Sequence, residues 1–180
     1  MIYLDKTSQK KFHLRSFEPA VYEGAPDNLI VEGALRDDRF HDSHLATGEI
    51  RPPYTVHHMI IRMELRVPDL VIEEIEVEMP TVPHETCLEI RRSLAPLQGV
   101  RIAAGFTSRV RKLVAKETGC NHLMELLTAM APAAFQGAWS ARVSRPVDPE
   151  TYAGMMGNLK NTCWAWREDG PLVQKWLRNK

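Results

Sequence analysis

Two consecutive stretches of alternating residues constrain the fold of this chain more than any other feature. Between Val56 and Val67, apolar side chains recur at every second position, and the alternation returns over residues 70–79 after a turn at Pro68 and Asp69. A period of two places apolar side chains on one face of a β-strand and polar side chains on the other. The sequence therefore predicts an antiparallel hairpin with one buried face.

The same alternation gives neighbouring histidines opposite directions. His57 shares its parity with the apolar position Met59, so it is expected on the core side, whereas His58 is expected to point outward. The polar face of the second strand carries a row of acidic side chains, namely Glu74, Glu76 and Glu78. We interpret this row as cross-strand partners of Arg62 and Arg66 rather than as a cation site.

Further strands are predicted before this hairpin. Alternation starts a strand near Phe12, and residues 29–35 resume extended structure after a turn. Residues 37–53 lack a clear period, so they are predicted to form a long surface loop. The early part of the chain is therefore expected to form an antiparallel sheet.

Helical spacing dominates the later part of the chain. The predicted helices cover residues 85–94, 107–114 and 120–131, the last continuing past Pro132 around a kink. Near the end, Asp169 and Gly170 favour a hairpin between residues 162–166 and 172–176. The order of elements predicts an α+β fold, with a sheet of N-terminal strands packed against C-terminal helices.

Size and charge narrow the class of protein. A chain of 180 residues suits a single α+β domain, here residues 12–180 after a polar lead-in of residues 1–11. Lys plus Arg and Asp plus Glu number 23 each, so no net charge attracts nucleic acid. The chain starts without a signal peptide and contains no apolar run of about 20 residues, which predicts a cytoplasmic protein without a membrane segment.

Three cysteines are the most reactive side chains of the sequence. Cys87, Cys120 and Cys163 are odd in number and widely spaced in a chain without an export signal, so a disulfide framework is not expected. Cys87 falls in the first turn of a predicted helix, where free N–H groups and the helix dipole stabilise a thiolate. The remaining interpretations are inert core thiols, a reactive thiol, or metal ligands.

The segment from Gly119 to Leu127 is the predicted chemical centre. Cys120 and His122 begin a helix with a buried stripe, Leu123, Leu126, Leu127 and Met130. With His57, Cys87 and Cys163, they supply sulfur and nitrogen donors that suit zinc or iron, including an iron–sulfur cluster. The leading hypothesis is therefore metal binding by His57, Cys87, Cys120, His122 and Cys163, with a role in metal or cluster handling.

Two other classes of function stay open at this point. An enzyme acting on a small molecule could use the metal with an open position, or Cys120 as a nucleophile with His122 as its base. Two residues apart within a helical turn, those side chains are expected to point in different directions. A non-catalytic binding module is the third class, with a surface formed by four tryptophans, Trp139, Trp164, Trp166 and Trp176.

The three methionines of the hairpin bear on the assembly of the protein. Met59, Met63 and Met79 fit the core of the sheet, and a surface for a homodimer or another protein partner is the alternative.

Several short motifs together resemble a known family. They are Val56-His57-His58-Met59, Pro83-His84-Glu85-Thr86-Cys87, Gly105-Phe106-Thr107 and Gly119-Cys120-Asn121-His122-Leu123. They are similar to an uncharacterised bacterial family, domain of unknown function 2889, from about Leu14 to Trp166. The resemblance implies that His57, Cys87, Cys120, His122 and Cys163 are the polar signature positions, and it implies no activity.

A second, fainter resemblance is to the NifU-like scaffolds of iron–sulfur cluster assembly. The order of elements is similar, with His57 at the place of the first cysteine, Cys87 at the second, and Cys120 with His122 as the closing pair. This resemblance implies a NifU-like scaffold fold and an iron or iron–sulfur cargo. The acidic ligand position of those scaffolds is occupied here by Met59.

Overall fold

The computed structural model describes residues 7–114 and 119–178. Within it the chain divides into two compact units, Met1–Trp139 and Ser140–Lys180. The predicted single domain over residues 12–180 is not tested by this division and stays a prediction. The α+β class is confirmed, because the strands all precede the helices along the chain.

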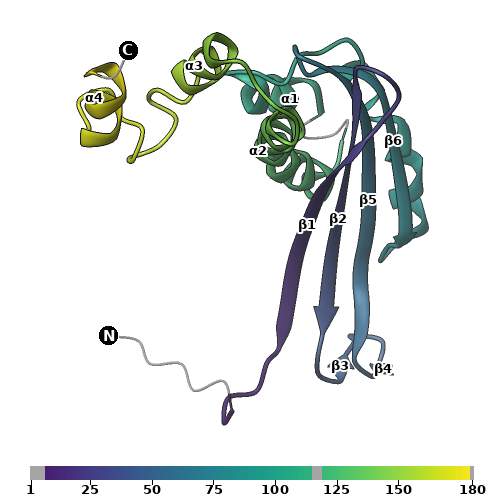
Figure 1. Cartoon of the computed structure of the whole chain (residues 1–180). Coiled ribbons are helices and arrows are strands. Elements are labelled where there is room, and N and C mark those ends of the chain that lie inside the picture. Colours follow the sequence, from purple (N-terminus) through teal and green to yellow (C-terminus); the bar gives the residue numbers. More distant parts are fainter. Residues whose placement is uncertain (1–6, 115–118, 179–180) are drawn as a thin grey trace. The chain divides into compact units, whose positions relative to one another are not determined.

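The first unit is built around a four-stranded antiparallel sheet (Figure 1). Its strands stand in the order β1-β2-β5-β6, so sequence neighbours pair, with β5 beside β2. Their bounds are β1, His13–Glu23; β2, Asn28–Arg39; β5, Tyr54–Arg66; and β6, Val71–Thr81. The predicted hairpin of residues 56–79 is thus confirmed as β5 and β6.

Strand β2 extends further than the sequence pattern indicated. It continues through Asp37 to Arg39, so the predicted loop over residues 37–53 is wrong at its first residues. Alternation is hidden there because four charged side chains follow one another from Arg36. The rest of that segment forms a small hairpin of β3 (Ser43–His44) and β4 (Ile50–Arg51), beyond the part of the sheet near α1 and α2 (Figure 1).

One face of the sheet carries the hydrophobic core. Val31, Leu35, Ile61 and Leu65 are fully buried there, at the alternate positions that strand geometry dictates. The hairpin methionines Met59, Met63 and Met79 are buried in the same core, which confirms their predicted packing role.

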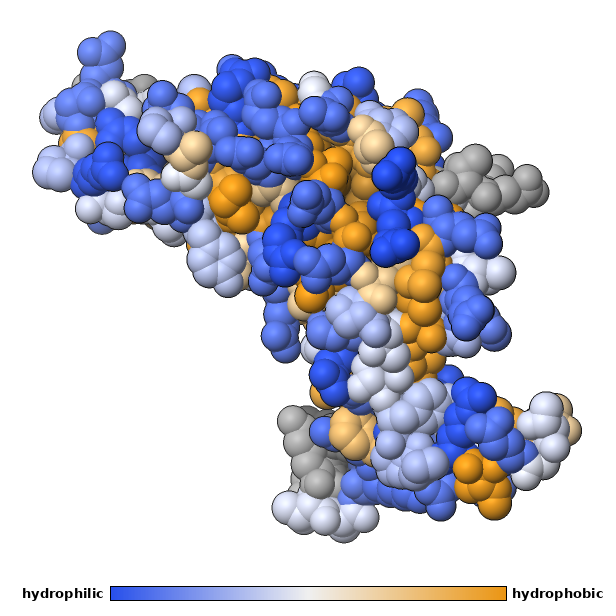
Figure 2. All heavy atoms as spheres, turned by 90° about the vertical axis from the view of Figure 1, so that its right-hand side faces the viewer, coloured by the Kyte–Doolittle hydropathy of each residue, from blue (hydrophilic) through white to orange (hydrophobic). Residues whose placement is uncertain are grey.

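The opposite, outer face is polar and held by charge pairs. Arg62 pairs with Glu78, as predicted for the acidic row, and also with Glu32 of β2. Arg66 pairs with Glu73, which lies outside the predicted row. Figure 2, viewed from the side of β6, shows hydrophilic side chains on both sides of a band of hydrophobic ones.

Helices cover the inner face of the sheet in the first unit. They are the 3₁₀ helices η1 (Glu85–Arg92) and η2 (Ala95–Leu97), followed by α1 (Phe106–Val114) and α2 (Asn121–Val143). The predicted stripe of α2, from Leu123 to Met130, is buried against the sheet. Gly33 permits this approach, because a Cβ atom there would lie 2.5 Å from the Met130 sulfur. No helix in the described ranges has the length and apolar character that crossing a membrane requires.

The second unit is helical after the end of α2. It contains α3 (Pro149–Gly157) and α4 (Pro171–Arg178), with Asp148 capping α3 by accepting from the Thr151 amide. The predicted hairpin of residues 162–176 is therefore wrong. Pro171 favours a helical first turn, because its fixed φ suits a helix start and its missing N–H costs nothing there.

Candidate functional site

A buried carboxylate on β2 is the centre of the candidate site. Asp37 is 2% exposed, and both of its oxygens accept hydrogen bonds. Oδ1 accepts from Arg15 Nε at 2.7 Å and from His13 Nε2 at 3.1 Å. Oδ2 accepts from Arg15 Nη2 at 2.8 Å and from His57 Nδ1 at 2.9 Å. Four donors therefore surround one carboxylate.

These donors decide the charge of Asp37. Burial alone would raise the pKa of a carboxyl group, but the forked bond from Arg15 and the bonds from His13 and His57 hold the pKa of Asp37 well below its usual range. An ionised carboxylate only accepts hydrogen bonds, so Nδ1 of His57 carries the hydrogen. The site thus holds a fixed negative charge at neutral pH.

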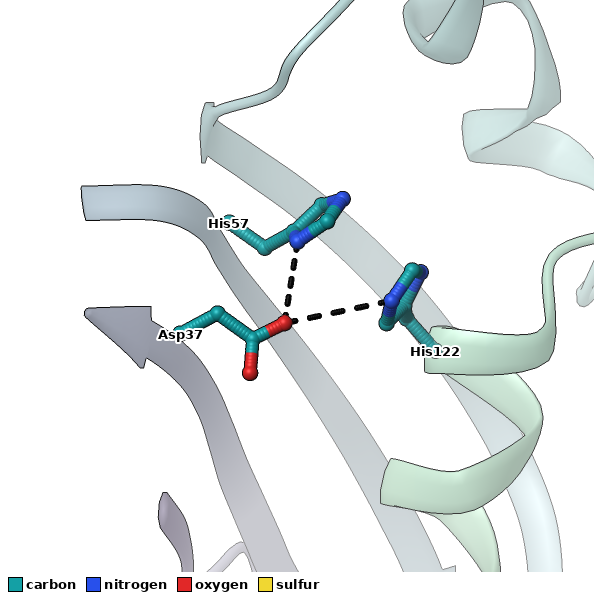
Figure 3. Close-up of side chains that lie close together, drawn as sticks. All are labelled: Asp37, His57 and His122. Atoms are coloured by element: carbon teal, nitrogen blue, oxygen red, sulfur yellow. Dashed lines mark hydrogen bonds and ion pairs between the residues drawn. The ribbon is translucent and has the colours of Figure 1, made fainter. Parts of the chain in front are cut away.

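Two imidazoles point toward this carboxylate from different elements (Figure 3). His57 comes from β5, paired with Asp37 across the strands, and His122 comes from the first turn of α2. Their ring centroids are 4.0 Å apart, and Nε2 of His122 lies 3.9 Å from Asp37 Oδ2. The prediction that His57 faces the core side is confirmed.

A second carboxylate links the site to α2. Arg15 donates through Nη1 to Glu125 Oε2 at 2.7 Å, one turn beyond His122. The pKa of His122 is lowered, first because burial disfavours its charged form and then because His57 and Arg15 add positive charge nearby. His122 is therefore held as a neutral imidazole, the form that binds metal ions.

Cys120 approaches His122 in spite of the sequence expectation. Its sulfur lies 3.6 Å from His122 Nδ1, so the prediction that the two side chains diverge is wrong. The reason is that α2 begins at Asn121, which leaves Cys120 as the residue before the helix; its carbonyl accepts from the Met124 amide. Its side chain is not bound to the helical spacing of 100° per residue.

The described residues contain one group of at least three side chains suited to a metal ion. It consists of Asp37, His57 and His122, each offering one ligand atom, and these atoms lie within 4.8 Å of one another. Two histidines and one carboxylate form a donor set that proteins use for zinc and for iron(II) with open coordination positions. The arrangement can therefore bind a divalent ion.

The structure brings together some of the predicted ligands and not others. His57 and His122 meet, and Cys120 stands beside His122. Cys87 lies half-buried in the first turn of η1, and Cys163 lies exposed in the second unit; neither belongs to the metal-binding group found among the described residues. Metal binding by Cys87 and Cys163 stays a prediction.

Sequence reasoning missed Asp37, Arg15 and His13. Asp37 was assigned to a loop, although it stands two residues after the buried Leu35 and so continues the inner face of β2. His13 and Arg15 alternate with Leu14 in β1 and lie opposite Arg39 and Asp37. The available signal was the alternation of inward and outward side chains. Continued two residues beyond the last apolar position of each strand, it would have placed the charged side chains there on the inner face.

Comparison with known proteins gives a family and no activity. A family model described as "Protein of unknown function (DUF2889)" matches residues 13–136. No curated protein and no solved structure matches the chain. The matched range contains the residues around the buried carboxylate, and the resemblance to NifU-like scaffolds stays a prediction.

Proposed function

We propose that this chain, which belongs to the DUF2889 family of proteins of unknown function, binds a single zinc or iron(II) ion through Asp37, His57 and His122. The observation that carries the proposal is the convergence of two imidazoles from β5 and α2 on one buried carboxylate of β2. Burial of an ionised carboxylate is costly unless a cation offsets it. Arg15 offsets one negative charge, but it binds both Asp37 and Glu125, so the two carboxylates carry one charge more than Arg15 neutralises. A metal ion would offset the remaining charge.

The spacing of the donor atoms supports this assignment. Atoms bound to one zinc ion at about 2.1 Å are roughly 3.4 Å apart in a tetrahedral shell. The separations from Asp37 Oδ2 are 2.9 Å to His57 Nδ1 and 3.9 Å to His122 Nε2. Side-chain movements of about half an ångström would bring both pairs to that spacing. The ion would take the place of the hydrogen that His57 donates to Asp37.

The donor set favours a single ion over an iron–sulfur cluster. Clusters are held chiefly by cysteine thiolates, and the group found among the described residues contains two nitrogens and one oxygen. Cys120 lies outside this group, because its sulfur contacts Nδ1 of His122 whereas Nε2 is the ring nitrogen that lies 3.9 Å from Asp37. Three protein ligands leave a position for water or a small molecule, as in catalytic zinc sites.

Metal stoichiometry of three histidine variants tests the proposal. Purified chain reconstituted with Zn²⁺ and dialysed should retain about one ion per chain, and His57→Ala or His122→Ala should lose most of it. The matched control is His58→Ala, because His58 neighbours His57 on the outer face of β5. Loss of zinc in the control alone, or full retention in both site variants, would refute the proposal.

A thiol-dependent enzyme is the second candidate, and the 3.6 Å contact between Cys120 and His122 favours it. In this arrangement His122 would accept the thiol proton and Cys120 would attack the substrate. It predicts faster alkylation of Cys120 by iodoacetamide than of the more exposed Cys163, with the advantage lost in His122→Ala. Rapid alkylation of a chain that binds no zinc would favour this candidate over the metal site.

A further inference from the structure

A surface hollow lies at the end of the sheet that carries β3 and β4. Its volume is about 470 Å³, and its lining includes Arg39, His41, Asp42, Ser43, His44 and Tyr54. Two of these residues come from the ends of β2 and β5, and the others come from the segment that leads into the small β3–β4 hairpin.

The strand register places this hollow beside the metal-binding group. Arg39 stands two residues after Asp37 in β2, so the two side chains leave the same face about 7 Å apart. Tyr54 is paired with Arg39, as His57 is paired with Asp37. Adjacent rows of the inner face therefore contain Asp37 and His57 of the metal-binding group and the two strand residues of the hollow.

A β-bulge in β5 makes this alignment possible. Asp37 pairs with His57 and Asp38 pairs with Thr55, which leaves Val56 as the extra residue. Thr55 donates to Asp38 at 2.7 Å, and Arg36 donates to Thr55 at 2.8 Å, on the outer face. Tyr54 is consequently returned to the inner face, three residues from His57 instead of two.

Two polar groups of the hollow have no partner within the described ranges. The Ser43 hydroxyl is buried and makes no hydrogen bond to any described residue. The Arg39 guanidinium likewise forms no ion pair with a described residue, whereas the arginines nearby at positions 15, 36 and 51 are paired. A buried hydroxyl without a partner is uncommon in native proteins and is accounted for by a water molecule or a ligand.

These groups suit an acidic ligand. An arginine fork binds a carboxylate through two parallel hydrogen bonds. The Ser43 hydroxyl has almost no solvent-accessible area, so it donates a third bond only after its side chain rotates toward the hollow. Asp42 also lines the hollow, and its negative charge opposes the positive charge of Arg39. The neighbouring His41 directs its Nδ1 to the Asp42 carbonyl. The hollow on the outer face near Arg62 offers no such site, because Arg62 is already paired with Glu32 and Glu78.

We propose that the hollow binds the carboxylate of a small organic acid through Arg39 and Ser43, while a second oxygen of the same molecule reaches the metal ion. This inference rests on the proposed metal site and names the class of its ligand. The ligand spans the spacing of two strand residues, about 7 Å, which matches a short dicarboxylate.

Calorimetric titration with glutarate tests the inference on full-length chain, both zinc-loaded and metal-free. Arg39→Gln should weaken glutarate binding to the zinc-loaded chain about tenfold or more, because a charge-assisted forked bond is lost. Ser43→Ala should weaken it about threefold. The matched control is Arg111→Gln, which removes the same charge from an exposed position of α1 and should leave the affinity unchanged.

The two proposals fail in different ways. Arg39→Gln should keep its zinc. Equal glutarate affinity in this variant and the wild type, with zinc bound in both, would refute carboxylate binding in the hollow and would not contradict the metal site. Arg39-dependent glutarate binding to a chain that retains no zinc would support the carboxylate site and overturn the metal site. Arg39-dependent binding of inorganic phosphate without any binding of glutarate would overturn the carboxylate assignment.

Discussion

Two arginine–carboxylate clusters on opposite faces of the same sheet contain the same chemical groups but differ in their exposure to solvent and in the number of hydrogen-bond donors around the carboxylate. On the inner face, Arg15 forks onto Asp37, whose side chain is 3% exposed and also accepts from two histidines. On the outer face, Arg62 reaches Glu32 and Glu78, whose side chains are 36% and 53% exposed. Water solvates the outer pair, whereas protein donors alone must stabilise the inner one.

This difference shows which charged groups the fold depends on. Exposed ion pairs contribute little because solvent screens them and ordering two long side chains costs entropy. A buried carboxylate that loses its negative charge leaves its donors desolvated and unpaired. Asp37 is therefore expected to depend on its four hydrogen-bond donors, which come from Arg15, His13 and His57.

The largest expected effect follows from neutralising the inner carboxylate. Asp37→Asn should lower the free energy of unfolding by on the order of 3 kcal/mol, because the Arg15 fork loses its acceptor charge. Urea denaturation monitored by circular dichroism measures this change. The outer-face control, Glu78→Gln, should leave the midpoint almost unchanged. Equal effects of both substitutions would contradict the comparison.

Acid should reduce the difference between these two faces. A depressed carboxyl pKa gives stability that is present above the pKa of the unfolded chain, about 3.9, and is lost as pH falls toward the folded value. The gap in unfolding free energy between wild type and Asp37→Asn should therefore stay constant from pH 7 to pH 5 and shrink below about pH 4. A gap that persists unchanged at pH 2 would show that its origin is not the charge of Asp37.

A smaller effect is expected from the close packing on the inner face. Gly33→Ala should destabilise the chain by about 1 kcal/mol, because the new Cβ would displace the Met130 side chain of α2. Ala34→Val places added methyl groups on the outer face, next to Gly33, and should be tolerated. Thermal unfolding of both variants measures the difference, and an equal loss in both would contradict it.

The smallest expected effect is a shift in one titration. In the metal-free chain, the His122 imidazole should titrate below its ordinary pKa, first because it is partly buried and then because of His57 and Arg15. Arg15→Gln should move the midpoint upward, since a nearby positive charge is removed. Nuclear magnetic resonance of the ring protons follows this titration. A downward movement in Arg15→Gln would refute the proposed electrostatic coupling.

The sheet was predictable because its signal is local. Alternation along the two hairpin strands depends only on which face is buried, so it predicted the strand limits to within two residues and the inward direction of His57. The apolar stripe predicted a helix from Cys120, and the helix begins one residue later, at Asn121. In the tail, the Asp169-Gly170 pair suggested a hairpin, but the spacing of Val173 and Trp176 fits the helix that forms.

The candidate site was only half predictable, since its other half depends on pairing between strands. His57 and His122 were recognised, whereas Asp37 and Arg15 bear charges at positions where a strand pattern is expected to be apolar. Their complementarity becomes visible only when β1 and β2 are placed in register. The predicted metal set relied on the three cysteines, because sulfur is a conspicuous donor in a sequence and a buried aspartate is not.

The unpaired Val56 in β5 decides how a deletion in this strand would act. A variant lacking that single valine would still contain every histidine, arginine, aspartate and tyrosine discussed above. Tyr54 would then stand two residues before His57, which is the ordinary spacing for side chains on one face of a strand, and would stay on the inner face. An alignment that opens a one-residue gap at this point would therefore join two chains of the same geometry, whereas a gap at a paired residue of β5 would turn the side chains before it to the opposite face.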